Sequence, residues 1–162
     1  MSGVAYAGIL TAALGSGLMA GVFFAFSAFV MDGLASLPAL SGLTAMQSIN
    51  RAATSPLILA ALFGTTLVCI GLAVWAVAIG KGEASVGWVA SGSGLYLIGG
   101  LGVTVARNVP MNEALAKVDP ERHPEAGAHW ENYLARWTAW NHVRTVASLG
   151  ASVLLIVAGT RA

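Results

Sequence analysis

Long uncharged apolar stretches alternate with polar connections along this chain. No charged residue precedes Asp32, and residues 52–80, 84–106 and 145–160 are also free of charged side chains. A helix of about 20 apolar residues crosses the hydrocarbon core of a bilayer. We therefore predict an all-α, four-helix transmembrane bundle with spans at about 4–30, 56–79, 84–106 and 143–159. These spans form a single integral membrane domain over residues 1–162.

The polar connections have helical patterns of their own. In the connection after the first span, Leu43, Met46, Ile49 and Ala53 recur at helical spacing, which predicts a short amphipathic helix at the membrane interface. The long connection before the last span carries most of the charged residues. From about residue 126 it predicts a helical extension that runs into the last span.

Composition strengthens the membrane assignment. Hydrophobic residues make up 57% of the 162 residues and charged residues only 9%, whereas soluble domains carry roughly 25% charged residues. The mean hydropathy is +0.77. The lipid bilayer is therefore an expected partner, and a net charge of +1 gives no sign of nucleic-acid binding. The single cysteine, Cys69, excludes a disulfide framework within the chain.

The basic residues predict an orientation. Six of them lie on the side of the two long connections and two, Lys81 and Arg161, on the other side; the six are Arg51, Arg107, Lys117, Arg122, Arg136 and Arg144. Basic residues favour the cytoplasmic side. We expect both termini outside and the long connections in the cytoplasm, at the plasma membrane if the protein is bacterial.

Two polar segments are candidates for chemistry. The first, Arg107-Asn-Val-Pro-Met-Asn112, follows the third span, and Pro110 disfavours a continued helix there. It is either a helix end with Asn112 as a cap, or part of a site in which Asn108 and Asn112 offer hydrogen bonds.

The second segment, Trp137-Thr-Ala-Trp-Asn-His-Val-Arg-Thr145, leads into the last span. Trp137, Asn141, Thr145 and Ser148 recur every three or four residues and so share one stripe of the helix. Two interpretations remain open. The stripe faces the bundle and is functional, or the segment is an interfacial anchor with the rings of Trp137 and Trp140 at the headgroups, Arg144 snorkelling to phosphate and His142 in water.

The predicted topology brings both segments, with Asn50 and Arg51, to one end of the bundle. An imidazole changes protonation state near neutral pH, so His142 is a candidate general base. Asn108, Asn141 and Arg144 are candidates to stabilise a developing oxyanion. No metal site is predicted, because no two histidines stand at helical ligand spacing; haem or a single metal ion remains an open alternative.

At these residues the chain resembles the anthrone oxygenase family of small four-span membrane proteins. The resemblance rests on the Gly-rich first span running into Val22-Phe-Phe-Ala-Phe-Ser27, on Asn50-Arg51, on Asn108-Val-Pro-Met-Asn112, and on the Trp137–Thr145 segment. It implies a site formed by Asn108, Asn112, Trp137, Asn141, His142 and Arg144. It also implies O₂-dependent oxidation of an anthrone-type substrate.

We therefore expect a membrane oxygenase that takes a flat, apolar, phenol-bearing molecule from the bilayer, with no cofactor. His142, Asn108, Asn141 and Arg144 are its candidate catalytic residues. The candidate substrate-binding residues are Asn50, Arg51, Asn112, Trp137, Trp140 and Thr145. The alternative is a non-catalytic protein that binds a lipid or quinone or serves as a partner subunit. Homo-oligomers are compatible with either hypothesis.

Overall fold

The computed structural model describes residues 2–78, 83–122 and 124–161, and over these residues it contains helices and no strand. The end of the predicted second span, residue 79, and Lys81 lie outside the described residues. Four helical rods are long and apolar enough to cross a membrane: Gly3–Ala35, Pro56–Ala78, Val86–Ala116 and Ala126–Thr160. The predicted four-helix transmembrane bundle is confirmed.

The first and third rods are each built from several helical segments. The first consists of α1 (Gly3–Ala25), the π-helical η1 (Phe26–Val30) and α2 (Met31–Ala35). The third consists of α5 (Val86–Leu95), the π-helical η2 (Tyr96–Gly102) and η3 (Thr104–Asn108), and α6 (Val109–Ala116). Both rods therefore extend beyond the apolar runs that predict them.

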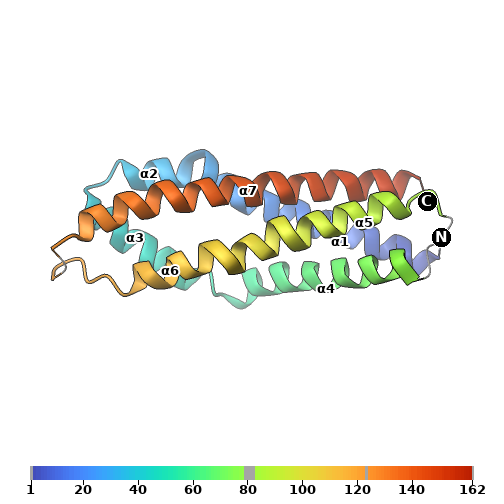
Figure 1. Ribbon diagram of the computed structural model, residues 1–162, viewed down its shortest axis with the longest axis horizontal. Helices are drawn as coiled ribbons and strands as arrows, with labels where there is room; N and C mark the ends of the chain where they lie inside the picture. The colour runs from blue at the N-terminus through green and yellow to red at the C-terminus, as the bar shows by residue number, and fades with distance from the viewer. Residues whose placement is uncertain (1, 79–82, 123, 162) are drawn as a thin grey trace.

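The second and fourth rods are uninterrupted. They are α4 (Pro56–Ala78) and α7 (Ala126–Thr160), and the short α3 (Ala39–Ala52) precedes α4. Helix α7 contains the predicted extension and the last span in one piece. It runs the length of the molecule, and the two termini lie together at one end (Figure 1).

Helices α3 and α4 lie in different halves of the bundle along its long axis (Figure 1). Figure 1 shows α4 beside the half nearer the termini and α3 in the other half. The amphipathic helix predicted after the first span is α3, and it packs its apolar face into the protein by burying Leu43 and Met46. Gln47 of α3 also donates hydrogen bonds to the carbonyls of Leu115 and Val118, at 2.9 Å each, which satisfies the open end of α6.

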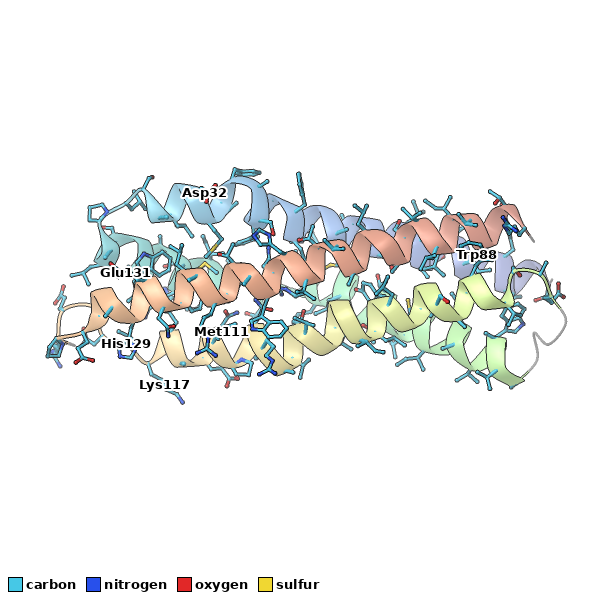
Figure 2. The ribbon with its side chains drawn as sticks, turned by 45° about the horizontal axis from the view of Figure 1, so that its top comes forward. Asp32, Trp88, Met111, Lys117, His129 and Glu131 are labelled. Carbon is cyan, nitrogen blue, oxygen red and sulfur yellow. The ribbon has the colours of Figure 1, made fainter. Side chains whose placement is uncertain are left out.

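Two hydrophobic clusters fill the interior. The one nearer the termini gathers α1, α4, α5 and α7 around residues such as Ile9, Leu72 and Leu155. The other gathers α2, α3 and α7 around Met46 and Trp130. Charged side chains collect around the second cluster, where Lys117, His129 and Glu131 lie far from Trp88 (Figure 2).

The outer surface beside the first cluster is apolar. Large exposed side chains there include Leu14, Leu18, Leu67, Val74, Ile98, Val146 and Val153. Such a surface is unfavourable in water but suits contact with lipid chains. The surface of this half of the molecule is therefore suited to contact with lipid.

Pro110 does not end the third rod. It lies in the first turn of α6, where a missing N–H costs little. Just before it, in η3, the chain is wound as a π-helix, and the N–H of Val109 bonds to the carbonyl of Thr104. The wider π turn accommodates the proline ring and lets the helix continue. The apolar run of the third span ends at residue 106, but the helix does not end there.

Candidate functional site

A layer of buried polar side chains separates the two hydrophobic clusters. It comprises Thr104, Asn108, Asn141, Arg144, Thr145 and Ser148, all buried, with the half-buried Ser27. The predicted stripe is confirmed, because Trp137, Asn141, Thr145 and Ser148 are all buried on α7.

The layer lies near the level at which the second candidate span, α4, begins. The hydroxyl of Tyr96 bonds to the carbonyl of Leu62, so these two residues lie at one level. At a rise of 1.5 Å per residue, the first residue of α4, Pro56, lies roughly 9 Å beyond that level and Thr104 roughly 12 Å beyond it. The polar layer is thus level with the start of α4, where that helix enters the bilayer.

Arg144 is the centre of this layer. Its side chain is only 6% exposed, so the predicted snorkelling to the headgroups is wrong. The guanidinium donates to Asn141 Oδ1 at 2.6 Å and to Thr104 Oγ1 at 3.3 Å. It also lies 4.2 Å from the ring centroid of Phe23 and 5.1 Å from that of Trp137, within cation–π range.

No carboxylate in the described part of the chain neutralises this buried cation. All seven acidic residues of the chain are exposed, and the described residues place none of them in an ion pair with Arg144. Within the same residues, Arg144 Nε and Asn108 Oδ1 have no hydrogen-bond partner. A buried charge costs several kcal/mol unless it is paired, so the position of Arg144 carries an energetic cost that no carboxylate among the described residues offsets.

A chain of hydrogen bonds leads outward from Arg144. Asn141 accepts from the guanidinium, and its Nδ2 donates to Ser27 Oγ at 2.8 Å and to the carbonyl of Phe23 at 2.7 Å. Ser27 Oγ lies 3.3 Å from Thr145 Oγ1. Thr145 uses its own proton on the carbonyl of Asn141, so Ser27 is the donor to Thr145. Each donor is thus polarised by the one before it, starting from a cation.

This chain ends beside an apolar groove on the lipid-facing surface. The groove lies between α1 and α7, has a volume of about 310 Å³, and is lined by Gly17, Ala20, Gly21, Phe24, Thr145 and Leu149. The lining residues of α1 follow helical spacing, and the small ones leave the space that forms the groove. Thr145 therefore connects the groove to the buried polar layer.

His142 lies on the outside of the bundle. It is exposed, unlike its neighbour Asn141. Residues 142, 145 and 149 stand at i, i+3 and i+7, so His142 continues the stripe of α7 that lines the groove. His142 thus lies on the outer face of α7, one helical turn before Thr145, and it is not among the residues that line the groove.

A second hydrogen-bonded group lies further from the termini. Asn112 Oδ1 accepts from the hydroxyl of Tyr133 and from Trp137 Nε1, both at 2.8 Å. Asn50 Nδ2 donates to Tyr133 Oη at 3.4 Å. The rings of Tyr133 and Trp137 stack with centroids 6.1 Å apart. These contacts fix the Trp137 ring, which in turn lies against the guanidinium of Arg144.

Two predicted residues lie apart from both groups. Arg51 is exposed and bonds to Ser48 within α3. Trp140 packs under the guanidinium of Arg107, with the two 4.9 Å apart. Asn108 joins the buried layer by donating to the carbonyl of Trp137 at 3.3 Å.

The sequence analysis did not place Ser27, Thr104 or Tyr133 in the site. Ser27 is a hydroxyl within an apolar run, and Tyr133 stands one helical turn before Trp137. Neither position marks its residue as part of a site in the sequence alone. Thr104 stands four residues before Asn108, and the two share the π-helical η3. π-Helical turns occur often at functional sites, and η1 and η3 supply Ser27, Thr104 and Asn108 to this one.

Residues 2–78, 83–122 and 124–161 contain no group of three His, Cys, Asp or Glu side chains that could hold a metal ion.

Comparison with known proteins identifies one family. Residues 56–154 match the family model described as anthrone oxygenase. The match begins with α4 and includes both polar segments, the Asn108–Asn112 motif and the Trp137–Thr145 motif. No curated protein and no solved structure shows significant similarity to this chain.

Proposed function

This chain belongs to the anthrone oxygenase family, and from that premise we propose that it is a membrane-embedded oxygenase for a flat, apolar, phenol-bearing substrate of the anthrone type. The substrate enters from the bilayer into the groove between α1 and α7. One observation carries this proposal: the hydrogen-bond chain from the uncompensated Arg144 through Asn141 to Ser27 ends beside that groove.

The reaction converts the CH₂ group of an anthrone into a carbonyl. A base removes one proton from the carbon, and the carbanion, delocalised as a phenolate, transfers an electron to O₂. The two radicals combine into a hydroperoxide. Loss of the second C–H proton and cleavage of the O–O bond release water and leave the quinone. One substrate and one O₂ thus give one quinone and one water, and the substrate itself supplies the electrons.

The residues around the groove have distinct roles in this mechanism. Ser27 turns its polarised hydroxyl from Thr145 to the substrate oxygen, where negative charge develops. Arg144 supports that charge through Asn141. His142, exposed one helical turn before the groove residue Thr145, accepts the proton. Asn112 and Trp137 position Arg144 by holding the aromatic ring on which it lies.

Oxygen uptake by the purified protein tests the proposal. The protein in phosphatidylcholine nanodiscs is supplied with 1,8-dihydroxyanthrone, and the spontaneous rate in empty nanodiscs is subtracted. We expect quinone formation above that rate. Ser27→Ala and His142→Ala should each lower it by roughly a hundredfold. Both variants should fold, because Ser27 is half-buried and His142 is exposed.

Matched controls separate the site from general effects. Ser48→Ala removes an exposed hydroxyl on α3, and Val143→Ala truncates the exposed side chain next to His142. Both should keep the parent rate. A parent protein that adds nothing to the spontaneous rate contradicts an oxygenase function. Normal turnover in both Ser27→Ala and His142→Ala contradicts the site.

The second candidate is a non-catalytic protein that binds a quinone or lipid in the same groove. The apolar lining of the groove and its exposure on the lipid-facing surface favour this function. Tight quinone binding without oxygen uptake would support this binding function against the oxygenase. The substitution Leu149→Ala should then weaken the binding of the quinone.

The orientation in the membrane belongs to the same proposal. We place the protein in the plasma membrane with both termini outside and the polar half in the cytoplasm, because basic residues dominate that half. The two termini lie at the same end of the bundle, which an even number of spans requires (Figure 1).

A further inference from the structure

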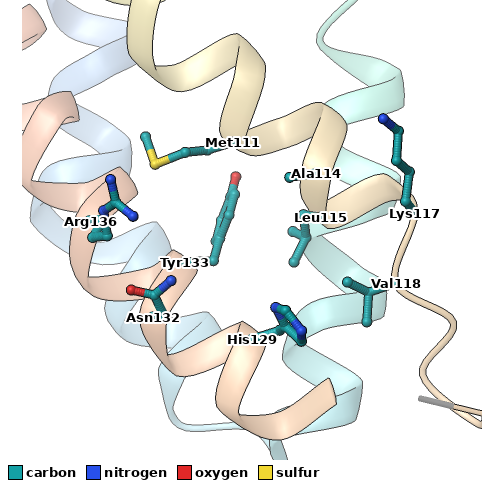
Figure 3. A pocket seen from close by; sticks show the side chains of 9 residues that line it. All are labelled: Met111, Ala114, Leu115, Lys117, Val118, His129, Asn132, Tyr133 and Arg136. Carbon is teal, nitrogen blue, oxygen red and sulfur yellow. The ribbon is translucent and has the colours of Figure 1, made fainter. Parts of the chain in front are cut away.

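A second pocket lies in the polar half, between α6 and α7. Its volume is about 350 Å³, which is within the range of small-molecule sites. Figure 3 shows the ring of Tyr133 standing between the two helices, with Arg136 on one side and Ala114 and Leu115 on the other. This pocket is distinct from the groove, with which it shares no lining residue.

The inner wall of the pocket is apolar. Leu115, Val118 and Tyr133 line it and are 3%, 8% and 6% exposed, and Met111 adds a flexible thioether. Leucine, valine and methionine side chains offer a ligand nothing but apolar contact, and the tyrosine ring adds a face for stacking. This wall therefore suits an aromatic body.

The outer part of the pocket is basic. Lys117 and Arg136 belong to the lining and are exposed, and His129 lines the pocket as well. No lining residue is acidic. Glu113, one turn before Lys117 on α6, is exposed and outside the lining. In Figure 3 the ammonium of Lys117 points away from the ring of Tyr133, and the flexible stem of this side chain lets the ammonium swing to an anion at the opening.

The pocket lies outside the hydrocarbon region. The lining residues that belong to α7 precede Arg144 by 8 to 15 positions, or roughly 12 to 22 Å along the helix axis. The polar layer around Arg144 is itself level with the start of α4. Lipid chains therefore do not reach this depth, and the ligand comes from the aqueous side.

We propose that this pocket binds a water-soluble aromatic anion of two or three fused rings, with a carboxylate or phenolate held by Arg136 and Lys117 and the rings stacked on Tyr133. The proposal is independent of oxygen chemistry. Tyr133 links the two regions, because its hydroxyl bonds to Asn112, and Asn112 also holds Trp137.

Binding of 1-hydroxy-2-naphthoate to the full-length protein tests this site, with 1-naphthol as the probe that lacks the carboxylate. Calorimetric titration uses protein in phosphatidylcholine nanodiscs, and empty nanodiscs correct for partition into lipid. The naphthoate should bind at least tenfold more tightly than the naphthol. Added salt should weaken only the naphthoate, because salt screens the ionic contacts.

Variants locate the binding. Lys117→Gln with Arg136→Gln should weaken naphthoate binding about tenfold or more, since two charge contacts are lost. Ala114→Phe fills the pocket and should abolish binding of both probes. Arg122→Gln with Arg161→Gln removes the same net charge outside the pocket and should leave affinity within twofold.

Several results would overturn the proposal. They are equal affinity for the two probes, equal loss in the two double variants, or unchanged binding in Ala114→Phe. Absence of binding at millimolar naphthoate would do the same. Tighter binding of soluble dihexanoyl phosphatidylglycerol through the same two basic residues would assign the pocket to lipid headgroups instead. None of these results depends on whether the protein consumes oxygen.

Discussion

Replacing Asn141 with leucine removes the connection between Arg144 and Ser27 while keeping a side chain of similar size. Asn141 makes three side-chain hydrogen bonds, to Arg144, to Ser27 and to the carbonyl of Phe23. Two of them join α7 to the first rod. The substitution therefore tests both the packing of the bundle and the integrity of the chain.

The expected loss follows from the strength of hydrogen bonds inside membranes. Such bonds contribute about 0.6 kcal/mol on average and about 1.7 at most. Three of them give a loss between about 2 and 5 kcal/mol for Asn141→Leu. The upper half of that range is expected, because the bond to the guanidinium is short and charge-assisted and its loss leaves a buried donor unpaired.

Unfolding in mixed detergent micelles, followed by far-UV circular dichroism, measures this loss. The matched control is Asn132→Leu, the same change at an exposed position of the same helix. It should stay within about 0.5 kcal/mol of the parent. If Asn141→Leu proves as stable as Asn132→Leu, the buried hydrogen bonds do not hold the polar layer together and the reasoning fails.

Two further predictions concern packing and topology. A Cβ at Gly99 would collide with the side chain of Ala147, whereas one at Gly94 would meet open space. In the same unfolding assay, Gly99→Ala should therefore destabilise the protein by about 1–3 kcal/mol, and Gly94→Ala should stabilise it by up to about 1 kcal/mol. Equal effects of the two substitutions would contradict the close packing of η2 on α7. In a Cys69→Ala background, a membrane-impermeant maleimide should label Ser2→Cys on intact cells and Glu121→Cys only after lysis, and the reverse pattern would invert the proposed orientation.

The sequence was sufficient to predict the spans and the common end of the polar motifs. Uncharged runs of lipid-crossing length determine helices strongly, because an unpaired backbone cannot exist in hydrocarbon. The spacing of Trp137, Asn141, Thr145 and Ser148 also identified the buried stripe of α7. These features depend on short-range periodicity, which one sequence shows directly.

The partners of that stripe could not be predicted. Ser27 and Thr104 meet α7 through contacts between residues 40 to 118 positions apart, and no single helix pattern contains that information. The π-helical turns were missed as well, although Pro110 shows where one is needed. The exposure of His142 depends on how α7 is rotated against the other helices. Because His142 is next to Asn141 in the sequence, both residues were expected in the same site.

The central claim is that Arg144 is kept for function and not for stability, and the variant Arg144→Met tests it most directly. Its unfolding free energy and its rate of quinone formation are measured on the same preparation. Replacing the buried arginine by an apolar side chain of similar length removes the desolvation cost of the charge, which is several kcal/mol per buried ion. We predict stability within about 1 kcal/mol of the parent or above it, with turnover reduced at least a hundredfold. A variant that keeps its turnover, or one that loses turnover only because it unfolds, would contradict the account.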